Sequence, residues 1–70
     1  MLWLFHRGGE YLSCEVRTCV ENTGFELLIA RRGRVDREWY PDEHEIARRW
    51  EDVNRQLRQE GWGEFASSTG

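Results

Sequence analysis

The pattern of apolar and polar positions is most regular near the end of the chain. The apolar positions recur at spacings of four, three and four residues, at Ile46, Trp50, Val53 and Leu57. This spacing predicts a helix with a single apolar stripe. Asp42 stands at the N-cap position, with Glu45 three residues later as in a capping box. Gly61 suits the left-handed position after the last turn, which would lay Trp62 on Leu57.

The first forty residues show the patterns of β-strands separated by turns. We expect strands at residues 2–6, 11–20, 25–31 and 35–40. Gly8-Gly9 is a two-residue hairpin signal, and a turn there would pair Phe5 with Leu12 and Trp3 with Cys14. Apolar and polar residues then alternate along residues 12–17, which is typical of a half-buried strand.

The second predicted turn contains turn-forming residues at positions 21–24. A four-residue loop there would pair Val20 with Phe25 and Val16 with Ile29. This register keeps the apolar residues of both strands on the same side of the sheet.

The inward side of the fourth strand is open to two interpretations. A two-residue turn before it would direct Tyr40 toward the core. A three-residue turn with a bulge would direct Val35 and Trp39 inward instead, and we favour this second arrangement.

These elements predict an α+β fold: a four-stranded antiparallel meander with one C-terminal amphipathic helix packed on one face (ββββα, two layers). We expect one domain at residues 1–66 and a disordered tail at 67–70. The sheet face that the helix leaves uncovered would carry Leu2, Leu4, Tyr11, Arg17, Leu28 and Ala30. Small monomers rarely expose clustered apolar residues, so this face predicts a non-enzymatic protein–protein interaction module, with a homodimer as one form. The alternative is that the segment around Trp62 and Phe65 folds over it.

The composition favours a folded chain with no general affinity for polyanions. The chain has 70 residues, 39% of them hydrophobic, and a formal net charge of −3, whereas proteins that bind nucleic acid or anionic membranes usually carry excess positive charge. No segment resembles a signal peptide or a membrane span, so we expect a soluble cytoplasmic protein without a membrane partner.

All ten basic residues are arginine, and four of them lie around the third turn: Arg31, Arg32, Arg34 and Arg37. This cluster could contact phosphate groups, with Trp39 or Tyr40 stacking on a base. The alternative is a solvated hairpin tip that protects a sheet edge. A nucleic-acid-binding accessory protein is therefore the second functional hypothesis.

The sequence contains no recognisable catalytic, metal or cofactor motif. Cys14 and Cys19 are five residues apart on one predicted strand, which is too far for a disulfide. The odd spacing also places them on opposite faces of the strand, so we expect Cys14 in the core and Cys19 as an exposed thiol. Together with His6 and His44 they fit no zinc spacing. We therefore expect no enzyme activity, no metal and no cofactor.

The order of MLWLF, Gly-Gly, a long second strand, Gly-Phe-Glu-Leu, Arg-Gly-Arg and a helix ending in Gly-Trp resembles small uncharacterised bacterial open reading frames of similar length. The β-β-β-α portion is also similar in topology to integrase arm-binding and plant ethylene-response DNA-binding domains. That second resemblance implies DNA reading by a basic and aromatic sheet, whereas acidic residues interrupt the strands here at Glu15, Glu26, Asp36 and Glu38.

Overall fold

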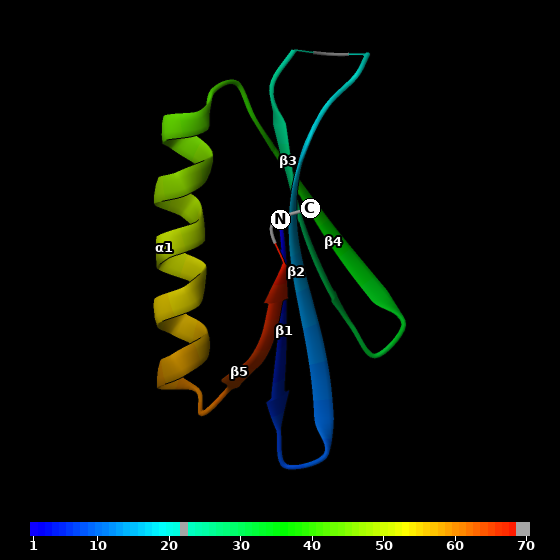
Figure 1. Ribbon diagram of the computed structural model, residues 1–70, viewed down its shortest axis with the longest axis vertical. Helices are drawn as coiled ribbons and strands as arrows, with labels where there is room; N and C mark the ends of the chain where they lie inside the picture. The colour runs from blue at the N-terminus through cyan, green and yellow to red at the C-terminus, as the bar shows by residue number, and fades with distance from the viewer. Residues whose placement is uncertain (22, 69–70) are drawn as a thin grey trace.

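A helix lies along one side of an antiparallel sheet in the computed structural model, which describes residues 1–21 and 23–68 (Figure 1). The elements are β1 (Leu2–Arg7), β2 (Glu10–Thr18), β3 (Phe25–Arg31), β4 (Arg34–Tyr40), α1 (Glu43–Gln59) and β5 (Gly63–Ser68). The strands form one sheet in the order β4-β3-β2-β1-β5. The α+β class and the single amphipathic helix are as the sequence predicts.

The fifth strand corrects the predicted four-stranded meander. β5 pairs antiparallel with β1, and Ser67 and Ser68, predicted as part of a disordered tail, are its last two residues. Residues 69–70 of that predicted tail lie outside the described residues. Without β5, the apolar β1 would present an unpaired edge, and pairing with β5 covers it. The serines of β5 have little intrinsic preference for strands, so this pairing rather than local propensity accounts for the strand.

The helix begins and ends as its sequence predicts. The Asp42 side chain accepts a hydrogen bond from the amide of Glu45 at 2.9 Å. At the other end, the amide of Trp62 donates to the carbonyl of Leu57 at 2.9 Å and the amide of Gly61 to that of Arg58 at 3.1 Å. These are the two bonds of a Schellman motif, which requires the positive φ that Gly61 adopts (93°).

The core lies between α1 and the facing side of the sheet. Its buried members are Phe5, Leu12, Cys14, Leu27, Ile46, Val53, Leu57 and Trp62. Trp50 belongs to the predicted stripe but is only half-buried, because it stacks on Trp3 at the margin of the core with ring centroids 4.1 Å apart. The first hairpin has the predicted register, Phe5 opposite Leu12 and Trp3 opposite Cys14.

The register of the second hairpin differs from the prediction by two residues. Val16 lies opposite Leu27 rather than Ile29, and Thr18 lies opposite Phe25. The loop is therefore longer than expected and leaves Val20 97% exposed, while the amide of Cys19 donates to the carbonyl of Gly24 at 3.0 Å. A shift of two preserves which side each strand residue faces, so Val16 and Leu27 stay on the core side, whereas Val20 lies beyond the end of β2. Asn22, in this loop, lies outside the described residues.

The residues of the fourth strand also face the opposite sides of the sheet from the arrangement that we favoured. Arg32 and Gly33 both have positive φ (51° and 73°) and form a two-residue turn of the type that suits a twisted hairpin. This turn places Tyr40 opposite Phe25 on the helix side, so Val35 and Trp39 lie on the other side of the sheet. The turn geometry fixes the register of this hairpin.

Candidate interaction surface

The side of the sheet away from α1, which we call the reverse face, is covered by no element of the described chain (Figure 1). The register places two rows of residues across it. One row contains Leu4, Ser13, Ala30 and Val35, and the next contains Leu2, Glu15, Leu28 and Arg37. The reverse face therefore carries all four apolar residues predicted for the uncovered side, each half-buried by its neighbours: Leu2, Leu4, Leu28 and Ala30.

Phe65 extends this apolar surface at the margin formed by β5. The pairing of β1 with β5 shifts register between Leu4 and Phe5, and Phe65 is the residue of β5 without a partner there. Its ring packs edge-on against His6 and Tyr11, with centroid distances of 5.4 and 6.0 Å. Phe65 thus borders the reverse face without folding over it, and half of its surface is exposed.

The remaining end of the reverse face carries charges of both signs. Arg17 donates to Glu26 through Nε at 3.2 Å and Nη2 at 2.9 Å, and Arg37 lies 3.7 Å from the same carboxylate. Glu15 lies in the adjacent row. Two arginines and two glutamates cancel, so this end of the surface has no net charge at neutral pH. Tyr11 and Arg17, both predicted for this face, are exposed.

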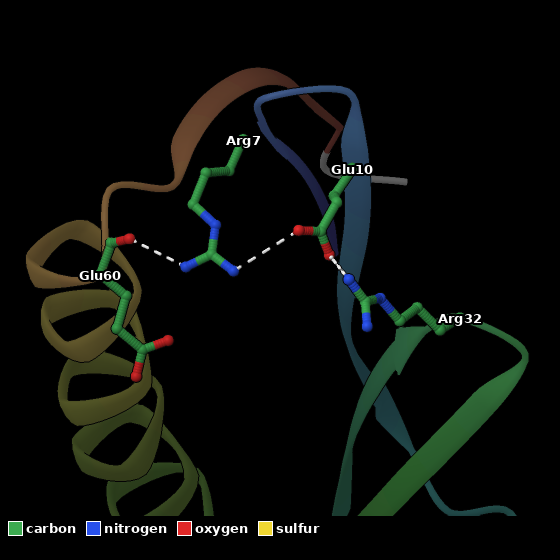
Figure 2. Close-up of polar contacts among 4 residues, drawn as sticks. All are labelled: Arg7, Glu10, Arg32 and Glu60. Atoms are coloured by element: carbon green, nitrogen blue, oxygen red, sulfur yellow. Dashed lines mark hydrogen bonds and ion pairs between the residues drawn. The ribbon is translucent and has the colours of Figure 1, made fainter.

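The predicted phosphate-contact turn is largely neutralised by carboxylates. Arg32 pairs with Glu10 at 2.6 Å, Arg34 with Asp36 at 3.3 Å, and Arg37 with Glu26 at 3.7 Å. Figure 2 shows how Arg32 belongs to a chain of contacts that continues from Glu10 to Arg7. Arg31 makes none of the ion pairs found within the described part of the chain, so it is the member of the turn best able to meet an anion.

Arg7 joins this chain of contacts to the end of the helix. Its Nη1 donates to the backbone carbonyl of Glu60 at 2.9 Å (Figure 2), and its guanidinium lies 4.6 Å from the centre of the Trp62 ring. A cation at this position meets the negative end of the helix dipole and satisfies a terminal carbonyl. Arg7 therefore has a structural role that the sequence pattern does not reveal, because its partners are distant in the chain.

The cysteines and histidines do not form a reactive or metal-binding group. Both cysteines are free thiols, and burial raises the pKa of Cys14 to about 12. Cys19 is half-buried rather than exposed, and His44 is exposed in the first turn of α1. Residues 1–21 and 23–68 contain no cluster of three or more potential metal ligands. No helix in that part of the chain is long and apolar enough to cross a membrane.

The chain matches no family model, and comparisons with curated proteins and with solved structures return no significant similarity.

Proposed function

We propose that this protein is a non-enzymatic protein–protein interaction module that binds through its reverse face. The observation that carries the proposal is the apolar centre of that face, formed by Leu2, Leu4, Leu28 and Ala30, with Val35 beside it and nothing of the described chain above it. Protein interfaces typically have such a dry apolar centre with aromatic and polar residues around it. Tyr11, Phe65 and Trp39 supply exposed aromatic rings at the margin.

The proposed occupant is a second copy of this chain. A two-fold interface uses the same patch on both partners, so the patch must tolerate its own charges. The equal numbers of arginine and glutamate on the reverse face meet this condition, because either sign on one copy can approach the opposite sign on the other. A strongly acidic or basic partner would find no complementary field there.

The size of the reverse face is sufficient for a small dimer. Five strands at a spacing of about 4.8 Å, with strands about 23 Å long, give a face of about 550 Å². Two copies would bury about 1,100 Å², which is near the lower limit of about 1,000 Å² for specific association. The expected dimer is accordingly of modest affinity.

Light scattering coupled to size-exclusion chromatography at micromolar concentration tests this proposal. We expect a mass that rises toward twice that of the chain as concentration increases, together with binding of an apolar dye when the protein is dilute. The proposal fails if the protein remains monomeric and binds no dye, because the reverse face would then attract neither its own copy nor an apolar probe.

A nucleic-acid-binding accessory role through Arg31, Arg32, Arg34 and Arg37 is the alternative function. The observation that favours it is the exposed Arg31 at the hairpin tip. The net charge of −3 and the carboxylate partners of the other arginines oppose it. An electrophoretic shift assay across a salt series decides the matter, since phosphate contacts are strongest at low salt and absence of binding there excludes this role.

A further inference from the structure

A cavity of about 570 Å³ opens between the first half of α1 and the sheet, and it reaches the edge of the reverse face at Glu15 and Arg17. Its apolar wall includes Trp3, Val16, Phe25, Ile46, Ala47 and Trp50. Four of these residues, Trp3, Val16, Phe25 and Trp50, are only half-buried although they pack against the core. The core is therefore incomplete at this end, and a small apolar group would complete it. The volume lies within the range of about 300–1,000 Å³ that is usual for small-molecule sites.

The charged groups around the cavity indicate which ligands it would prefer. Arg17 also borders the cavity, but its guanidinium is held by Glu26 at 2.9 Å. The amino group of Met1 donates to the carbonyl of Val16 at 3.0 Å. Glu43, in the first turn of α1, takes part in none of the ion pairs within the described residues. Glu15 also lines the cavity and takes part in none of those ion pairs. The Met1 amino group keeps its positive charge because its acceptor is a neutral carbonyl, so two unpaired carboxylates and one ammonium group border the aromatic wall and leave one net negative charge.

The stacked indoles of Trp3 and Trp50 add a second preference for positive charge. Their ring centroids are 4.1 Å apart, and both side chains line the cavity. The face of an indole attracts a nearby ammonium group through its quadrupole, and its area favours contact with another flat ring. A ligand with an aromatic ring on a short chain that ends in a protonated amine could stack its ring on the indoles and pair its ammonium group with a carboxylate.

We propose that the cavity between α1 and strands β1–β3 binds small arylalkylamines, with the aryl ring against Trp3 and Trp50 and the ammonium group toward Glu43. The cavity meets the edge of the reverse face at Glu15 and Arg17, but its aromatic wall lies on the side of α1, and the proposed binding does not depend on the interaction function. The preference for an amine over a carboxylate of the same size distinguishes it from non-specific apolar adsorption.

Phenethylamine and phenylpropanoate are matched probes of opposite charge, because both carry a phenyl ring on a short chain. Titration of each against the intrinsic fluorescence of the protein, excited where phenyl rings do not absorb, follows the tryptophans that line the cavity. We expect saturable binding in the millimolar range, with the amine bound about two- to fivefold more tightly, as one half-solvated charge pair allows. Absence of saturable binding, or equal affinity for both probes, overturns the proposal.

Two variants assign the binding to this cavity. Glu43→Gln should reduce the preference for the amine, because Glu15 remains at the cavity, and should leave binding of the phenyl ring, whereas the control Glu51→Gln, at another exposed position of α1, should change neither. Ala47→Phe should weaken both probes by filling the cavity, and its circular dichroism should show an intact helix. If the amine instead perturbs the NMR signals of Leu4 and Ala30 on the reverse face, or if Ala47→Phe binds like the wild type, the site assignment is wrong.

Discussion

Cys14 and Cys19 lie in different environments, although both are free thiols near the same sheet. Burial raises the pKa of Cys14 to about 12, so it stays protonated and inaccessible at mildly alkaline pH. We expect a thiol reagent to modify Cys19 first and Cys14 only when the protein unfolds. A time course with and without denaturant measures this, and equal rates for both thiols in the native protein would contradict the position of Cys14 in the core.

Arg7 offers a second prediction about a single residue. Its guanidinium contacts the carbonyl of Glu60 and the ring of Trp62, so Arg7→Ala should lower the free energy of unfolding by about 1 kcal/mol. Urea denaturation measures the change. Arg55→Ala is the matched control: among the described residues Arg55 pairs with Asp52 alone, on the exposed helix surface, so its loss should have almost no effect. Equal losses for the two variants would show that Arg7 does not stabilise the end of α1.

At the level of elements, the ion pair between Glu38 and Arg49 connects β4 to α1. Arg49 donates to both carboxylate oxygens, at 2.7 and 3.0 Å, and Tyr40 donates to Glu38 at 2.6 Å. The hydrogen bonds from Arg49 lower the pKa of Glu38 from its ordinary value of 4.5, although partial burial opposes this effect. The same contact raises the pKa of Arg49, and burial with the bond to Glu38 raises that of Tyr40.

This pair predicts a specific dependence of stability on pH. Because the folded state lowers the pKa of Glu38, its stabilising effect is complete above about pH 4.5 and is lost as the pH falls through the lower, folded value. Glu38→Gln should therefore be less stable than the wild type at neutral pH, and the difference should shrink in acid. Chemical denaturation at a series of pH values tests this, with Glu51→Gln as a control. A constant difference at all pH values would exclude the assigned role.

The elements also show which parts of the fold the sequence can predict. The helix, its two ends and the first hairpin follow from local patterns: the stripe from Ile46 to Leu57, the Asp42 cap, and Gly8-Gly9. Strand β5 depends on pairing with the distant β1, and its own residues show no strand pattern. The parity of β4 depends on whether Arg32 accepts a positive φ, which composition does not reveal.

The candidate surface was predictable to a similar extent. Alternation along the first three strands places Leu2, Leu4, Leu28 and Ala30 on one face before any coordinates are known. Val35 and Trp39 also lie on this face, although the sequence favours the opposite side, because their position follows from the turn rather than from hydrophobicity. Phe65 joins them only through the irregular pairing of β5 with β1. Non-local pairing therefore determines the margin of the surface, and local pattern determines its centre.

At the scale of the whole molecule, the two sides of the sheet differ in what covers them. The side that faces α1 holds the core and an open cavity, and the reverse face holds apolar residues that the described chain leaves uncovered. The acidic balance of the chain and the paired arginines reduce its attraction for polyanions. These features together favour recruitment of a neutral, apolar partner surface, for which a second copy of the chain is the simplest candidate.

Sedimentation equilibrium of the wild type beside Leu4→Lys and Gln59→Lys is the most direct test of this claim. Leu4 lies at the centre of the reverse face, whereas Gln59 is exposed at the end of α1, so the two variants add the same charge at different surfaces. We predict dimerisation of the wild type and of Gln59→Lys at micromolar concentration, and a dissociation constant at least about tenfold higher for Leu4→Lys, since a buried unpaired charge opposes association. Identical association of all three folded proteins would show that the reverse face is not the interface.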